Sequence, residues 1–238
     1  MKVREAVVVS NPRKKEATRI RKEVERFLSE LGVRIVNKKK ADMLVTVSGD
    51  GTILYNKDRF DAPIFGIGSE KSFICQARAE NWKDALKQAV YSGRIEERMM
   101  LSSRLDDKRM KDALNEVVVR NRAHRILELK LVAGKKEFEF RADGVIFSTP
   151  TGSSAYAYSC GGIELEKTAM EYEVVAIAPF RRAFTPLIVS ENDVCTLEIR
   201  SECDAHAVID GQFVYRLKRK SRVEVWKSKR KARLFSIG

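Results

Sequence analysis

Two segments of the sequence carry residues whose types and spacing suit a bound ligand better than a hydrophobic core. The first is Ser48-Gly49-Asp50-Gly51-Thr52, directly after the apolar run 43–47. This order predicts a strand, a tight turn and a helix start, with glycines that let the backbone approach a ligand and Thr52 as the helix cap. Free amides at a helix start attract phosphate, and the Asp50 carboxylate beside them could hold Mg²⁺ or accept a proton from an attacking hydroxyl. Taken alone, the segment also fits an ordinary Asp-Gly turn.

The second segment is the run 143–162, DGVIFSTPTGSSAYAYSCGG, in which a plausible strand leads into small residues and hydroxyls. Such residues fill a hydrophobic interior poorly and predict a surface that lies against a polar ligand. Tyr156 is available for stacking, and Gly161 and Gly162 let the backbone turn. The alternative for this segment alone is a Ser/Thr-rich connection without chemistry.

The elements that must position these segments differ between the two parts of the chain. Strand patterns at 6–10, 33–36, 43–47 and 63–67 alternate with helical patterns at 15–31 and 81–91. This alternation predicts a parallel α/β sheet, whose ligands bind at the carboxyl ends of strands, where Asn11 and the Ser48–Thr52 turn fall. From Arg94 onward, short strands follow one another with turns such as Asp210-Gly211, read as a type I′ hairpin, and predict a mostly antiparallel β domain.

Composition restricts the partners. The 46 Lys and Arg against 33 Asp and Glu leave a net charge of +13, which favours an anionic partner. The basic runs are dispersed along the chain, so we expect no nucleic-acid-binding element. No apolar stretch approaches the ~20 residues that span a bilayer, and the start of the chain is charged too early for a signal peptide. We therefore expect a cytoplasmic protein that does not bind membranes.

Cysteines and histidines do not suggest a metal site built from protein side chains. The four cysteines are scattered and form no CxxC pair, and the two histidines are far apart in sequence; they are Cys75, Cys160, Cys195, Cys203, His124 and His206. Zinc sites need closely spaced ligands of these types. We expect no protein metal centre and reduced thiols.

Three motifs in order, SGDGT at 48–52, Asn115-Glu116 at the head of a strand, and DGVIFSTPTGSSAY at 143–156, make the chain resemble the NAD kinase family. The resemblance runs from about residue 5 to about residue 215 and is to a compact, archaeal-like form. It implies an ATP-NAD 2′-phosphotransferase that uses Mg²⁺ or another divalent cation with ATP or a polyphosphate, takes NAD as its substrate, and forms a homodimer or homotetramer.

The resemblance also implies a fold of α/β plus all-β class. An N-terminal parallel α/β domain, related to that of phosphofructokinases, would span residues 1–94, and a C-terminal β-sandwich would span 95–226. Residues 227–238 would return to the first domain.

Roles for individual residues follow from the resemblance. Asp50 is the expected catalytic residue, as a general base or as the group that orients the ribose hydroxyl. Asn115 would hydrogen-bond the adenosine half of NAD and Glu116 the hydroxyls of a ribose. Asp143 would face the nicotinamide half. The remaining residues expected to bind the nucleotides are Asn11, Gly49, Gly51, Thr52, Phe73, Thr151, Ser154, Ala155, Tyr156 and Ser159.

The chain departs from the family pattern at several positions. Ser48 stands where the family usually has a first glycine, and GIGSEKSFICQ at 66–76 replaces a glycine- and histidine-rich loop, with Phe73 left as the aromatic contact to adenine. Ala178-Pro179-Phe180-Arg181 replaces an SPH segment. Two other functions stay open: a kinase of a lipid or sugar that shares the GDGT turn, and a dinucleotide- or nucleic-acid-binding module without turnover.

Overall fold

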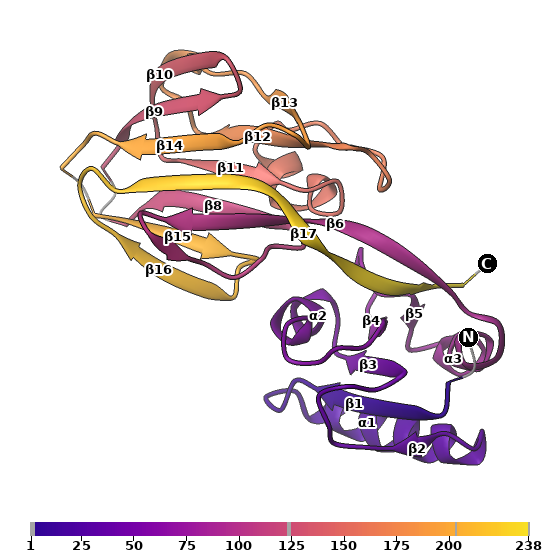
Figure 1. The fold of residues 1–238 in the computed structure, drawn as a ribbon. Helices are drawn as coiled ribbons and strands as arrows, with labels where there is room; N and C mark the ends of the chain where they lie inside the picture. The colour runs from indigo at the N-terminus through magenta and orange to yellow at the C-terminus, as the bar shows by residue number, and fades with distance from the viewer. Residues whose placement is uncertain (1–2, 123–124, 203, 238) are drawn as a thin grey trace. The chain divides into compact units, whose positions relative to one another are not determined.

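The computed structural model describes residues 3–122, 125–202 and 204–237, so His124 and Cys203 lie outside the described residues. The chain divides into two compact units (Figure 1). Unit 1 comprises Met1–Glu97 together with Ala232–Gly238, and unit 2 comprises Arg98–Lys231. Within the described part of the chain, no helix is both long and apolar enough to cross a membrane.

Unit 1 is built on a parallel sheet whose strands follow the order β2-β1-β3-β4. These strands are β1 (Glu5–Ser10), β2 (Arg34–Ile35), β3 (Met43–Val47) and β4 (Ile64–Gly68), with the short β5 (Ala77–Arg78) paired to β4. The helices are α1 (Lys15–Glu30), α2 (Asp50–Asn56) and α3 (Trp82–Ser92). The last strand of the chain, β17 (Arg222–Ser236), ends in this unit, where Leu234 pairs in parallel with Ile64.

The apolar residues of these elements explain their packing. All five residues of β3 are buried, as expected for a strand covered on both faces. The stripe Ala17, Val24 and Leu28 buries one face of α1, and a fully buried side chain of the size of Val24 or Leu28 contributes about 1.5–3 kcal/mol. Gly32, with φ +77°, ends this helix in the left-handed conformation that glycine adopts most readily.

Unit 2 is a β-sandwich. One layer follows the order β13-β12-β11-β8-β15-β16, and all its neighbours are antiparallel. The other contains β10-β9-β14 and the first part of β17, also antiparallel. The strands are β6 (Arg94–Leu105), β7 (Lys108–Arg109), β8 (Glu116–Asn121), β9 (Leu127–Ala133), β10 (Lys136–Ala142), β11 (Gly144–Ser148), β12 (Glu171–Ile177), β13 (Leu187–Ser190), β14 (Cys195–Ile199), β15 (Ala205–Ile209) and β16 (Phe213–Leu217).

A single buried cluster fills the space between the two layers, and alternate residues supply it. Phe147 and Val145 enter it from β11, while Leu129 and Leu131 enter it from β9. The residues between them on β11, such as Ile146, face the outer side of the first layer, where a smaller apolar cluster includes Val118 and Val175. The outer side of this layer carries the candidate site.

The sequence patterns locate most elements within one or two residues, and β3 has the predicted bounds. The strand β13 was not predicted, because its residues follow a region without a clear pattern. The turn Ser153–Ala157 is a short π-helical segment, where only a loop was expected. The Asp210-Gly211 hairpin is confirmed as type I′, since both residues have positive φ, 53° and 64°.

Candidate active site

The SGDGT turn of unit 1 lies at the carboxyl end of β3, as predicted, but its helix begins earlier than expected. The amides of Ser48 and Gly49 both donate to the carbonyl of Ile67, at 3.0 and 3.3 Å. Gly49 has φ +102° and ends the turn, so α2 begins at Asp50. The prediction of Thr52 as the helix cap is therefore wrong: Thr52 is buried inside the helix, and no side chain caps it. Gly51 is exposed in the first turn of α2.

The Asp50 carboxylate anchors the loop that follows β4. Its Oδ2 accepts the amide of Phe73 at 2.6 Å, and its Oδ1 accepts the amides of Ile74 and Cys75 at 3.1 and 3.2 Å. Burial raises the pKa of the neighbouring Cys75 thiol, and the Asp50 carboxylate, which interacts with that thiol, acts in the same direction. The Phe73 side chain itself is 65% exposed, which leaves it free to stack on a base.

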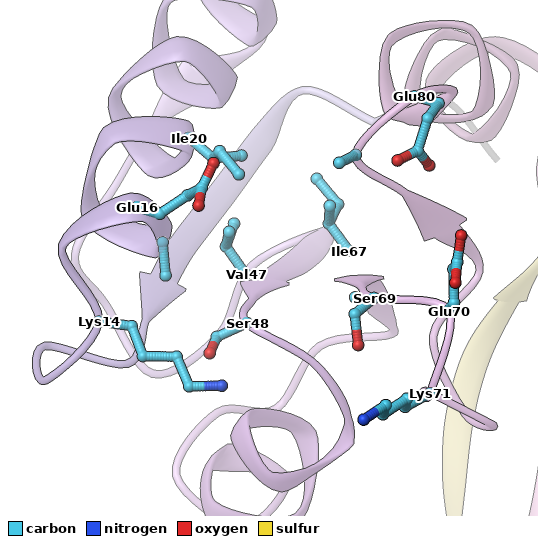
Figure 2. Close-up of a pocket in the computed structure, with 13 residues that line it drawn as sticks. Lys14, Glu16, Ile20, Val47, Ser48, Ile67, Ser69, Glu70, Lys71 and Glu80 are labelled. Atoms are coloured by element: carbon cyan, nitrogen blue, oxygen red, sulfur yellow. The ribbon is translucent and has the colours of Figure 1, made fainter.

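A pocket of about 440 Å³ lies beside this turn, lined at the carboxyl ends of β3 and β4 and at the first turn of α1 (Figure 2). Lys14 and Lys71 line it, and no carboxylate of the described residues lies within ion-pair distance of either ammonium group. Figure 2 shows both ammonium groups on the same side of the pocket as the Ser48 and Ser69 hydroxyls. Two unpaired ammonium groups beside hydroxyls attract the phosphate groups of a ligand.

The rest of the pocket is part acidic and part apolar. Its other lining residues are Glu16, Ala17, Ile20, Val47, Ile67, Gly68, Glu70, Ala79 and Glu80. Asn11, Gly49, Asp50, Gly51, Thr52 and Phe73 do not line it. Asn11 instead closes the turn after β1, where its Oδ1 accepts the Arg13 amide at 3.0 Å. Sequence reasoning missed Lys14 and Lys71, although Lys14 follows the carboxyl end of a parallel strand, where ligands usually bind.

In unit 2, three polar residues form one row across neighbouring strands. Ser148 on β11 pairs with Glu116 on β8 and with Glu173 on β12. Residues that pair directly across strands lie on the same face of a sheet. Both carboxyl groups therefore lie on one face, at the end of β11 where the 149–162 loop begins. Glu173 is fully buried, and its Oε2 accepts the Ile163 amide at 2.9 Å. Its pKa is raised by burial, with the Ile163 bond acting in the opposite direction.

A buried carboxylate holds the Asn115-Glu116 pair in place. Asp210, 2% exposed, accepts the amides of Leu114, Asn115 and Glu116, at 3.0, 2.8 and 3.2 Å. The sequence showed Asp210 only as a hairpin residue, because a contact across 95 positions leaves no local signal. These three bonds fix the backbone from which the Asn115 and Glu116 side chains extend.

Both of these side chains keep an unused polar atom. Asn115 Oδ1 and Glu116 Oε2 are buried and have no hydrogen-bond partner among the described residues. Buried polar atoms without partners are rare in native proteins, and a bound ligand or an ordered water usually completes them. This pair is therefore the strongest ligand-binding feature of unit 2.

The hydroxyl-rich loop serves two purposes, and the expectation that it would not fill an interior is wrong for part of it. Ser148, Thr149 and Ser153 are fully buried and bond to backbone groups of the loop and of residue 114. Thr149 Oγ1 donates to the Leu114 carbonyl at 2.5 Å and accepts the Gly152 amide at 3.1 Å. Small polar residues stabilise a tight loop in this way because each hydroxyl replaces a missing backbone partner.

Most of the remaining residues of the loop are those expected to bind the dinucleotide. Thr151, Ser154, Ala155 and Tyr156 are partly exposed, and Ser159 is exposed. Ala155 interrupts the π-helical turn with φ −100° and ψ −118°. The Tyr156 ring packs against the outer apolar cluster, which leaves it on the face that carries Glu116.

Asp143 lies away from these residues, at the other end of β11. Its Oδ1 accepts the Asn121 side-chain amide at 3.1 Å. Asp143 precedes Ser148 by five positions along the strand, a span of about 17 Å. The structure therefore brings Asn115 and Glu116 together with the loop but separates Asp143 from them. Polar residues at both ends of one strand suit an extended ligand that is long enough to contact both.

We expect Glu116 to make stability depend on pH. Burial raises the pKa of this carboxyl to about 8, and the Asp210 carboxylate acts in the same direction. Because the pKa in the unfolded chain is lower, the folded state binds more protons between about pH 4.5 and 8, so stability falls as pH rises through that range. The Glu116→Gln variant should lack this loss of unfolding free energy, which is on the order of 4 kcal/mol at most. Urea unfolding at pH 5, 6.5 and 8 measures it.

Glu202→Gln is the control for this experiment, since Glu202 is exposed on the surface. The wild type and this control should lose the same stability with rising pH. If the Glu116→Gln variant loses as much as they do, the buried carboxyl does not titrate in this range.

These features define a class of protein. A parallel α/β unit with a Gly-Asp-Gly turn and a cationic pocket, joined in one chain to a β-sandwich with unpaired polar atoms, is the architecture of a nucleotide-dependent phosphotransferase. A family model for the C-terminal domain of ATP-NAD kinases matches residues 114–237, more than half of the chain. The chain belongs to the NAD kinase family, so the resemblance predicted from the three motifs is confirmed.

Individual relatives agree with this assignment. The NAD kinase of Methanothermobacter thermautotrophicus is 37% identical over 214 residues, which cover 86% of this chain and 75% of that protein. The NAD kinase of Methanoregula boonei is 35% identical over 182 residues, covering 74% of this chain and 67% of that protein. The archaeal character expected from the sequence is consistent with both.

Solved structures share the fold. The crystal structure of an NAD kinase from Archaeoglobus fulgidus in complex with ATP is 28% identical, with a TM-score of 0.84, and covers 98% of this chain and 93% of that one. The structure of yeast NADH kinase complexed with NADH has a TM-score of 0.86 over 100% of this chain and 84% of that one; at 17% identity it supports the fold alone. The predicted α/β plus all-β class is confirmed.

Proposed function

We propose that this protein transfers the γ-phosphoryl group of ATP to the 2′-hydroxyl of the adenosine ribose of NAD, giving NADP. The observation that carries this function is the pair of unpaired buried atoms, Asn115 Oδ1 and Glu116 Oε2, in the motif that the family match covers. An amide oxygen and a carboxyl group accept hydrogen bonds from an adenine amino group and from ribose hydroxyls.

Asp50 takes the chemical role in this proposal. The ribose 2′-oxygen attacks the γ-phosphorus, ADP leaves, and the hydroxyl proton must be accepted. The Asp50 carboxylate orients the hydroxyl and receives its proton. Three amide bonds hold the carboxylate in a fixed position, and positioning supplies much of the rate in phosphoryl transfer.

The pocket of unit 1 is the proposed site of the phosphate donor. Lys14 and Lys71 neutralise the triphosphate, and apolar side chains such as Ile20 and Ile67 receive the nucleoside. Its glutamates repel an inorganic polyphosphate that fills the whole pocket, whereas a carboxylate can accept hydrogen bonds from ribose hydroxyls. This composition favours ATP over polyphosphate as the donor.

The residues present fit a divalent cation that arrives with ATP. Among the residues the structure describes, no group of three or more carboxylate, cysteine or histidine side chains forms a metal cage. Mg²⁺ typically takes one or two protein carboxylates and completes its shell with phosphate oxygens and water, and Glu16, Glu70 and Glu80 of the pocket are available for this purpose. When bound, the ion neutralises charge on the phosphates.

Two further proposals concern the setting of the enzyme. We place the activity in the cytoplasm, in keeping with its nucleotide substrates. We also propose a homodimer or homotetramer, which is what the family resemblance implies.

The purified protein should convert NAD to NADP in the presence of ATP and Mg²⁺, as measured by coupling the product to an NADP-specific dehydrogenase. Inorganic polyphosphate in place of ATP should support a slower reaction, because the glutamates of the pocket repel it. A lipid or sugar acceptor should give no ADP above background. Binding of NAD without NADP formation would instead indicate a module without turnover.

A further inference from the structure

Ser48 adopts a backbone conformation that favours glycine. Its φ is +127°, and the amides of Ser48 and of Gly49 are held to the Ile67 carbonyl, so the turn cannot relax without losing both bonds. A side chain at such a φ stores strain. A glycine at position 48 would adopt the same turn without strain.

The Ser48 hydroxyl gains nothing from the protein that offsets this strain. Its Oγ is buried and has no hydrogen-bond partner among the described residues. Ser48 as a whole is only half-buried and lines the pocket, on the same side as the ammonium groups of Lys14 and Lys71 (Figure 2). A serine side chain can occupy three staggered positions about its Cα–Cβ bond, so this unpaired hydroxyl is free to change direction when a ligand binds.

We propose that Ser48 is a donor-binding residue, whose hydroxyl donates a hydrogen bond to a phosphate oxygen of the nucleoside triphosphate that Lys14 and Lys71 neutralise. The inference rests on the proposed donor pocket. Strained residues persist where the strain serves a ligand, and a hydrogen bond to a charged phosphate is stronger than one between neutral groups. The chain therefore gives up stability at this turn for affinity toward its phosphate donor.

Two variants separate the hydroxyl from the strain. Ser48→Ala removes the hydroxyl and keeps a Cβ at the strained φ, whereas Ser48→Gly removes both. We expect both variants to raise the KM for ATP about tenfold or more, because a hydrogen bond to a charged group is lost, with the KM for NAD unchanged. Only Ser48→Gly should raise Tm, by about 2–4 °C.

A binding measurement makes the test independent of turnover. ATP should raise the Tm of the wild type more than that of either variant at equal ATP concentration. An unchanged KM and an unchanged ATP-induced Tm shift in Ser48→Ala would overturn the proposal. If the wild type forms no NADP but the variants still lose the ATP-induced shift, the Ser48 proposal holds and the proposed function fails.

Discussion

Asp50→Asn should lower kcat for NADP formation by about 10²- to 10⁴-fold, the usual contribution of a positioned acid or base. The substitution also turns an acceptor oxygen into an NH₂ group that faces a backbone amide, because both oxygens of the carboxylate accept amides of residues 73–75. Stability should therefore fall as well. Steady-state kinetics with saturating NAD and ATP, combined with a thermal unfolding curve for each variant, separates these effects.

Asp210→Asn is the matched comparison, since the Asp210 carboxylate also accepts three consecutive backbone amides. Both variants lose the same kind of anchor and should lose similar stability. Asp210→Asn should raise the KM for NAD, because it loosens the Asn115-Glu116 pair, but should keep most of kcat. An equal loss of kcat in the two variants would mean that Asp50 only supports the loop.

Gly152→Ala should cost about 3 kcal/mol or more of unfolding free energy and abolish most NAD binding. A Cβ at this position would lie 2.2 Å from the carbonyl oxygen of Asn115 and 2.7 Å from its Cα. These are backbone atoms, held in turn by Asp210, so the loop must move away from the Asn115-Glu116 pair. Chemical denaturation and calorimetric titration with NAD measure the two effects.

Gly161→Ala, in the same loop, is the control for packing. Gly161 has φ +89°, but a Cβ there would meet no atom within 4 Å, so only backbone strain of about 1 kcal/mol is expected. NAD affinity should stay close to that of the wild type. Equal NAD affinities in the two alanine variants would show that contact between the loop and Asn115 is not needed for binding.

Local patterns in the sequence predict the elements that depend on neighbouring residues. Strands such as Met43–Val47 follow from their own apolar runs, and the Asp210-Gly211 turn follows from the φ values its residues favour. The position of Asp50 at the end of a parallel strand follows from the alternation of strands and helices. These features depend on neighbouring residues, so the sequence predicts them well.

Contacts between distant segments were not predictable in the same way. No local pattern links Asp50 to residues 73–75, or Asp210 to the amides of residues 114–116. The burial of Thr149 and Ser153 depends on where their hydroxyls find backbone partners, which composition does not reveal. Composition predicted a ligand-binding surface, whereas the structure divides the loop into an internal scaffold and a partly exposed side.

The last part of β17 belongs to unit 1, although it is made only after the whole of unit 2. Leu234 pairs with Ile64, and Phe235, 1% exposed, completes the core of unit 1. These residues follow the whole of unit 2 in the chain. At about 5–20 residues per second, the ribosome needs roughly ten seconds to make the residues between. During that time the first-made unit lacks part of its core, so its stability during synthesis depends on residues made after the second unit is complete.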